Sequence, residues 1–239
     1  SRQLDPTNKD ILFGQGVYNY FADVMPKKYP VIRPVMWFLA DGDRALGLEQ
    51  LETVATEGRY ARAEALYFLA QIHRLFEEDN ATALTYLEQL HGMYPDNALF
   101  HRYRARTLVS LGRWNEAATL YAQVDERSRA GQAGYHVRGH IEASYILGRQ
   151  AFRQRRYPEA LRHFAAADSL SPQLGDSTER QAANGYTALA NLYRGRTLDL
   201  LGHRESALQA YDRVLSLPKQ GRSHERARQY TKAPYERSS

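Results

Sequence analysis

Hydrophobic residues recur every three or four positions through most of the chain, which is the period of amphipathic helices. The pattern is clearest from Ile141 to Pro172. In the second half of this stretch, Ala160, Phe164 and Ala167 follow at steps of four and three, on the face turned toward neighbouring helices. Pro172 cannot continue a helix. The stretch therefore predicts two helices joined by a turn and ended by a proline.

Small residues at fixed places in this stretch predict close packing of the two helices. Gly148 on the first helix and Ala160 on the second let the backbones approach closely. Pro158 suits the first turn of the second helix. The same unit recurs along the sequence, and its expected repeat positions are Ala70, Ala83, Ala105, Ala117, Gly148, Ala160, Phe164, Gly195, Ala207 and Tyr211.

The spacing between the second-helix alanines measures the repeat. Ala83 and Ala117 are 34 residues apart, and the next two intervals are 43 and 47 residues. We expect the extra residues to lengthen the first helices backward, so that they begin at about Ala130 and Ser177. Asp176 is a candidate N-cap for the later helix, because Glu179 follows at the capping-box spacing.

These motifs resemble a known repeat. The pattern Ser144-x2-Leu147-Gly148-x2-Ala151, followed by A-x3-F and a closing proline, resembles the tetratricopeptide pattern of W-x2-L-G-x2-Y, A-x3-F and P. Four such units cover residues 63–218. The resemblance implies an all-α fold, a right-handed α-solenoid of antiparallel helix pairs, whose concave groove is lined by first helices and binds a peptide segment of another protein. The segment from Asp41 to Leu51 is also similar to the start of a eukaryotic tetratricopeptide family linked to the mitochondrial outer membrane and inclusion-body clearance.

The sequence before the repeats predicts an atypical capping region over residues 1–58. Asp5 and Pro6 favour a helix start, and the helix is expected to run from Pro6 to Val24. Pro26, Pro30 and Pro34 should then break the helix, leaving residues 29–38 as a short apolar helix or an extended connector. Asp43 should cap a helix over residues 44–57. The predicted organisation is therefore residues 1–58 as a cap, 59–218 as repeats, and 219–239 as a basic polar tail.

Composition narrows the function. Charged residues make up 25 % of the 239 residues, no apolar run reaches the length of a membrane span, and there is no cysteine. Without cysteine, the sequence does not distinguish a cytoplasmic from a periplasmic or secreted protein. None of the G-x-S-x-G, Walker A or Rossmann motifs is present, so we expect no enzymatic activity and no cofactor.

His136 and His140 lie one helical turn apart, but no third ligand is evident, so we expect a solvated pair and no metal site.

The net charge lies mostly in the tail. Residues 219–239 contain six basic and two acidic side chains, which accounts for +4 of the net charge of +5. The repeats are close to neutral, which argues against nucleic acid as their partner. Three functions remain open: an adaptor that binds a peptide in its groove, a structural protein that self-associates through the apolar residues from Val31 to Phe38, and a binder of nucleic acid or anionic membrane through the tail. The first helix could instead cover the apolar segment.

The resemblance also implies which side chains line the groove. The ninth positions of three consecutive first helices are Arg106, Arg149 and Arg196. The other implied groove residues are Tyr67, Arg102, Tyr145 and Leu192 at the fifth positions, and Phe152 and Arg153 at the twelfth and thirteenth.

Arginines beside tyrosines suit carboxylates, so we expect an acidic peptide or the C-terminus of a partner protein as the ligand. The chaperone-binding carboxylate clamp of this family has asparagine at the ninth position, so chaperone tails are not expected. In the alternative interpretation each arginine pairs with an acid on the next helix, such as Glu142 or Asp199.

Overall fold

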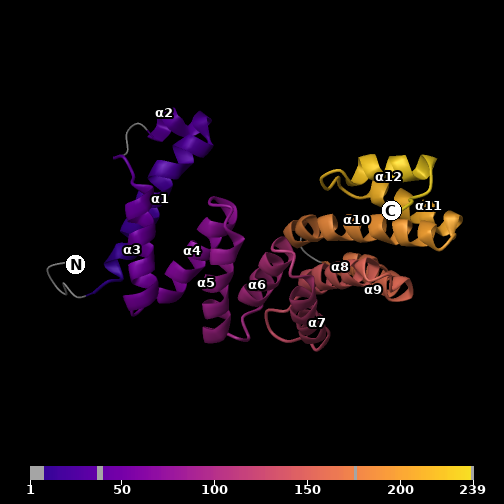
Figure 1. The fold of residues 1–239 in the computed structure, drawn as a ribbon, viewed down its shortest axis with the longest axis horizontal. Helices are drawn as coiled ribbons and strands as arrows, with labels where there is room; N and C mark the ends of the chain where they lie inside the picture. The colour runs from indigo at the N-terminus through magenta and orange to yellow at the C-terminus, as the bar shows by residue number, and fades with distance from the viewer. Residues whose placement is uncertain (1–7, 37–39, 175–176, 238–239) are drawn as a thin grey trace. The chain divides into compact units, whose positions relative to one another are not determined.

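The structure, a computed structural model, describes residues 8–36, 40–174 and 177–237. Within these ranges every regular element is helical and there is no β-strand (Figure 1). The elements are α1 (Ile11–Lys28), the 3-10 turn η1 (Pro30–Ile32), α2 (Arg33–Met36), α3 (Arg44–Glu57), α4 (Arg62–Leu75), α5 (Asn80–Met93), α6 (Ala98–Ser110), α7 (Trp114–Arg129), α8 (Val137–Arg153), α9 (Tyr157–Leu170), the 3-10 turn η2 (Ser171–Gln173), α10 (Ser177–Leu200), α11 (Arg204–Ser216) and α12 (Ser223–Lys232).

The protein divides into two compact units, residues 1–111 and 112–239. In the N-terminal unit α1 packs on α3, α3 on α4, α4 on α5 and α5 on α6. In the C-terminal unit each helix from α7 to α12 packs on the next, and α8 also lies against α10. The prediction of an all-α, solenoid-like fold of packed helix pairs is confirmed. The boundary between the units falls inside the repeat expected over residues 98–125, so α6 and α7 belong to different units.

The first helix differs from its prediction. The expected start at Asp5 and Pro6 lies outside the described residues. The expected end at Val24 is wrong, because α1 continues through Pro26 to Lys28. A proline in the last turn removes only one backbone donor, and the two terminal lysines complement the helix dipole. The cap on α3 is as predicted, since the Asp43 carboxylate accepts the Leu46 N–H at 3.0 Å.

A buried tyrosine ties the N-terminal unit together. Tyr20 of α1 is fully buried, and its hydroxyl donates to the Glu77 carboxylate at 2.5 Å. Arg44, at the start of α3, donates to both oxygens of the same carboxylate. One carboxylate at the end of α4 therefore connects α1 and α3, two segments that are distant from it in the sequence.

The repeat positions of the C-terminal unit show why glycine is needed there. A Cβ atom placed on Gly148 would lie 2.5 Å from Cε1 of Phe164, far inside the normal contact distance. Gly195 has the same relation to the Tyr211 ring. In each pair the glycine of a first helix accommodates an aromatic ring of the second helix, 16 residues later. All ten expected repeat positions are buried.

The later part of the protein departs from the sequence pattern in two places. The first helix of the third pair begins at Val137 rather than at Ala130, because α7 continues to Arg129. The start of α10 at Ser177 is as predicted, whereas Asp176 lies outside the described residues and the Glu179 side chain is not described. The expected polar tail contains α12, which packs on α10 and α11.

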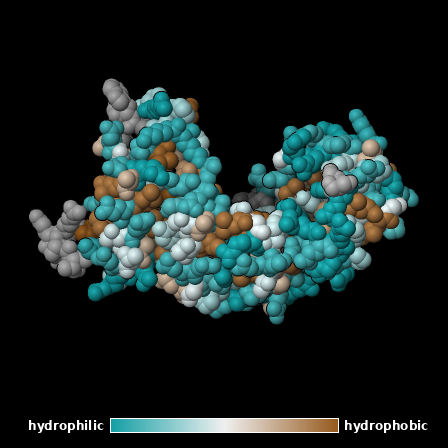
Figure 2. Space-filling model, viewed as in Figure 1, coloured by the Kyte–Doolittle hydropathy of each residue, from teal (hydrophilic) through white to brown (hydrophobic). Residues whose placement is uncertain are grey.

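The exposed apolar side chains are scattered rather than continuous. Figure 2 shows a mostly hydrophilic face, with hydrophobic groups over the helices nearest the N-terminus. Val31 is 85 % exposed and Tyr29 is 45 % exposed, whereas the side chains from Val35 to Leu39 are not described. Self-association through this segment stays a prediction. No described helix combines the length and the hydrophobicity needed to cross a bilayer.

Candidate functional site

Arg149, on α8, stacks on three aromatic rings. Its guanidinium carbon lies 4.7 Å from the centroid of Trp114, 5.2 Å from that of Tyr193 and 5.7 Å from that of Tyr145. The Nη1 atom also donates to the Tyr145 hydroxyl at 3.4 Å. All three distances lie within the range of a cation–π interaction. The side chain is therefore fixed by rings and not by an opposite charge.

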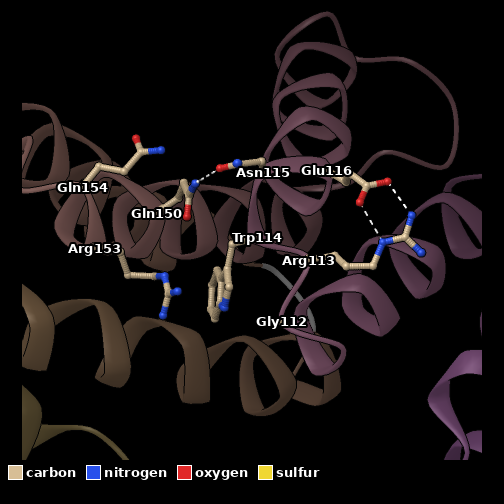
Figure 3. Close-up of a pocket in the computed structure, with 8 residues that line it drawn as sticks. All are labelled: Gly112, Arg113, Trp114, Asn115, Glu116, Gln150, Arg153 and Gln154. Atoms are coloured by element: carbon tan, nitrogen blue, oxygen red, sulfur yellow. Dashed lines mark hydrogen bonds and ion pairs between the residues drawn. The ribbon is translucent and has the colours of Figure 1, made fainter.

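Arg153 shares one of these rings. It is the last residue of α8, and its guanidinium carbon lies 4.7 Å from the Trp114 centroid. Figure 3 shows Arg153 and Trp114 facing the same space. Trp114 begins α7 directly after a turn in which Gly112 has a φ of +74°, a conformation that favours glycine. The pocket of about 380 Å³ at this place is lined by Gly112, Arg113, Trp114, Asn115, Glu116, Gln150, Arg153 and Gln154.

Arg196, on α10, stacks on a second set of rings. Its guanidinium carbon lies 4.6 Å from the Tyr193 centroid, 5.3 Å from that of Phe152 and 3.9 Å from that of Tyr235. Tyr193 thus contacts both Arg149 and Arg196. We call the three cations Arg149, Arg153 and Arg196, together with the rings they stack on, the arginine face.

No carboxylate of the described residues forms an ion pair with the three cations of the arginine face. The buried Nε atoms of Arg149 and Arg196 have no hydrogen-bond partner in the same part of the protein. Glu142 is fully buried and accepts the Tyr121 hydroxyl at 2.7 Å. Asp199 pairs with Arg204 at 2.9 Å. Within the described residues, neither of these acids therefore forms an ion pair with Arg149 or Arg196.

Comparisons with known proteins agree with this architecture. A family model described as a tetratricopeptide repeat matches residues 75–136. The chain therefore contains a tetratricopeptide repeat over these residues. A solved structure named "MamA RS-1 ArsTM double mutant" is similar, with a TM-score of 0.54 and 14 % identity, over 82 % of this chain and 95 % of that chain. At that identity the likeness concerns the fold. No curated protein is significantly similar to the sequence.

Two groups of the arginine face, Arg196 and Tyr145, have raised pKa values. Burial alone would lower the pKa of Arg196, but hydrogen bonding to Tyr235 raises it, and the net pKa is above the ordinary arginine value. Burial raises the pKa of Tyr145 to about 12, against the lowering effect of the Arg149 charge. At neutral pH Arg196 is therefore a cation and Tyr145 a neutral phenol.

Three other predicted residues lie in the N-terminal unit. Tyr67 packs with its ring centroid 6.2 Å from that of Tyr103. Arg106 stacks on the same Tyr103 ring at 5.7 Å. Arg102 lies on α6 and is partly buried. Tyr67 and Arg106 thus share the Tyr103 ring within that unit, and the candidate site is built from the C-terminal unit alone.

Sequence reasoning missed several members of the site. Leu192, predicted at a groove position, is buried in the core, and the next residue, Tyr193, supplies the ring. Trp114 follows a Gly-Arg dipeptide at a turn, which could have located it at a helix start but not beside α8. Tyr145 and Phe152, predicted as groove residues, are almost fully buried and act mainly by supporting arginines. Tyr235 has no signal in the sequence, because the residues around it are mostly polar.

Of the histidine pair predicted as solvated, His136 is exposed and His140 is partly buried. The His140 side chain is 14 % exposed, and its Nε2 atom lies 2.8 Å from the Asp125 carboxylate. Arg129 contacts the same carboxylate at 3.0 Å. Across the described ranges, no group of three or more His, Cys, Asp or Glu side chains could hold a metal ion. The Asp125 carboxylate is therefore shared by His140 and Arg129.

Proposed function

We propose that this protein is a non-enzymatic interaction module that binds an acidic segment of a partner protein on the arginine face. Tetratricopeptide repeats are in general protein-interaction scaffolds, and the charge of the face narrows the kind of partner. The observation that carries the proposal is the stacking of Arg149, Arg153 and Arg196 on aromatic rings without any ion pair in the described residues.

Stacking prepares these cations for carboxylates. The rings hold the guanidinium groups in place, and a guanidinium group can donate two parallel hydrogen bonds to a carboxylate through N–H groups that are not buried. Because the rings limit the rotamers before binding, less side-chain entropy is lost when a ligand arrives. Each hydrogen bond to a charged group contributes about 1.5–3 kcal/mol, so two or three such contacts contribute about 3–9 kcal/mol to binding.

Charge reversal on the face tests the proposal. The probe is a fluorescein-labelled pentapeptide with four glutamates around one tyrosine, and its counterpart has glutamines in place of the glutamates. We expect the wild-type protein to bind the glutamate peptide and not the glutamine peptide. The double variant Arg149→Glu and Arg196→Glu should weaken that binding at least about a hundredfold, because two charge-assisted contacts become repulsions.

The matched control reverses two arginines elsewhere in the same unit. Arg162 and Arg228 are exposed, and Arg162→Glu with Arg228→Glu changes the net charge by the same amount. If the control weakens binding as much as the face variant, the attraction is a general charge effect and the proposed site is wrong. Circular dichroism confirms that both variants are folded. A labelled single-stranded oligonucleotide in the same assay would identify a phosphate ligand, and preference for it over the glutamate peptide would also contradict the proposal.

A further inference from the structure

The segment that follows α12 lies against one end of the arginine face. The Tyr235 ring covers the Arg196 guanidinium group at 3.9 Å and lies 6.4 Å from the Phe152 ring. Arg237 lies 6.0 Å from Phe152. No sequence pattern predicts a residue of the tail at this place.

Tyr235 also makes a backbone contact with a buried acid. Its N–H donates to Oδ2 of Asp199 at 2.7 Å, and the Asp199 side chain has no exposed surface. The residue thus offers an aromatic side chain to a cation and a backbone donor to a carboxylate. This is the pair of contacts that one residue of an extended peptide makes when it docks in a polar-and-aromatic pocket.

The C-terminal tail makes more hydrogen bonds at the end of α12 than in the segment after it. The Arg204 guanidinium group donates to the carbonyl oxygens of Tyr230 and Thr231, both at 2.8 Å, which fixes the end of α12. Beyond Lys232, Pro234 has no N–H to donate, and the exposed side chains are those of Ala233, Pro234, Glu236 and Arg237. Tyr235 is therefore the main attachment of the segment after the helix, and this segment can leave the face while α12 stays in place.

We propose that the Arg196–Asp199 end of the face is a subsite for an aromatic residue of the partner, and that Tyr235 fills this subsite in the absence of the partner. The partner chemistry that fits is an extended acidic segment containing tyrosine, phenylalanine or tryptophan. Its acidic residues meet Arg149 and Arg153, and its aromatic residue replaces Tyr235 on Arg196. The inference deepens the proposed function and rests on it for the acidic part of the ligand.

Competition by an internal segment has a measurable consequence. A site that is open in only a fraction of the molecules binds its ligand with an apparent affinity reduced by that fraction. Tyr235→Ala removes the ring but keeps a backbone N–H at position 235 for Asp199. We therefore expect this variant to bind the labelled glutamate–tyrosine peptide about tenfold more tightly than the wild-type protein does. A peptide with alanine in place of the tyrosine should bind both proteins within about twofold of each other, because it does not use the subsite.

Two control variants of the full-length protein belong to the same assay. Tyr235→Phe keeps the ring and loses only the hydroxyl that hydrogen-bonds to Arg196, so its affinity should lie closer to that of the wild type than to that of Tyr235→Ala. Tyr60→Ala removes a tyrosine that is 78 % exposed in the N-terminal unit and should have no effect. If Tyr235→Ala leaves the affinity for the tyrosine peptide unchanged while the arginine double variant abolishes binding, the aromatic subsite is wrong and the acidic site stands.

A second measurement covers the case in which the aromatic subsite exists but the acidic peptide does not bind. N-acetyl-tyrosinamide is an uncharged aromatic probe that carries backbone-like N–H groups. Titrated into the ¹⁵N-labelled full-length protein, it should shift the amide resonances of Asp199 and Tyr235, and Tyr235→Ala should bind it more tightly. If these shifts occur although no acidic peptide binds, the aromatic subsite is supported and the acidic ligand is wrong. If neither resonance moves at millimolar probe, the aromatic subsite is refuted.

Discussion

Replacing Gly148 by leucine should destabilise the C-terminal unit, and the structure gives the reason. An added Cβ would lie 2.5 Å from Cε1 and 2.6 Å from Cδ1 of Phe164, where about 3.5–4.0 Å is normal for two carbons. The Phe164 ring is fully buried and lies 5.9 Å from the Tyr193 ring, so it has no free space to move into. The substitution therefore forces α8 and α9 apart or pushes Phe164 toward the arginine face.

The magnitude follows from two opposing effects. Overpacking of a filled core costs about 1–3 kcal/mol and occasionally more, and a leucine adds four heavy atoms where even one does not fit. Leucine also gains about 0.8 kcal/mol over glycine from its higher helix propensity. We expect a net loss of about 2–4 kcal/mol, which corresponds to a fall in Tm of roughly 5–15 °C for a protein of this size. Thermal melts followed by circular dichroism at the helical band measure it.

Two other glycines provide controls, because leucine at these positions should not lower Tm. Gly14 in α1 and Gly92 in α5 have no atom within 4 Å of an added Cβ. Leucine at either position should leave Tm unchanged or raise it slightly, because only the gain in helix propensity remains. Combining Gly148→Leu with Phe164→Ala removes the clashing ring, so the double variant should lose at least about 1 kcal/mol less than the sum of the single variants. A wild-type Tm for Gly148→Leu, or strict additivity in the double variant, would refute the packing argument.

Two further predictions concern the other unit and the ligand site. The hydrogen bond from Arg44 keeps the pKa of Glu77 below its ordinary value in the folded protein. The Glu77 carboxylate therefore stabilises the fold fully above about pH 4.3, its unfolded pKa. This stabilisation is lost as the pH falls through the lower folded pKa. Melts at pH 7, 4 and 3 should therefore show a shallower acid loss in Glu77→Gln than in wild type, and an equal loss would contradict the pairing. Trp114→Ala removes the ring shared by Arg149 and Arg153. Fluorescence polarisation should then show about five- to thirtyfold weaker binding of the glutamate–tyrosine peptide. An unchanged affinity would count against a role for the ring.

The repeats could be predicted because their signals are local. Gly148, Ala160 and Phe164 stand at fixed offsets within one helix pair, and such offsets determine which side chains meet. The same logic places Arg149 and Arg196 at equivalent positions of their helices, where both contact Tyr193. Helix ends are harder to predict, since a proline such as Pro26 is tolerated in a last turn when the rest of the helix is well packed.

The remaining parts of the site depend on contacts between distant segments. Trp114 precedes Arg149 by 35 residues, and Tyr235 follows Arg196 by 39. No periodicity within one helix pair relates such positions, so only the packing of neighbouring pairs reveals them. The partners of Asp199 illustrate the same point, because an acid at an apparently groove-facing position is occupied by donors from other segments.

The surroundings of Asp199 also restrict how the last helices can align. Its carboxylate receives the Arg204 guanidinium group, the Tyr211 hydroxyl at 2.7 Å and the Tyr235 N–H, which come from the start of α11, its middle and the segment after α12. If α10 slid by one turn against α11, this carboxylate would be buried without its donors, which costs several kcal/mol. Apolar faces rich in alanine tolerate such a slip far better. The buried acid therefore specifies the register of helices whose hydrophobic surfaces alone would allow more than one alignment.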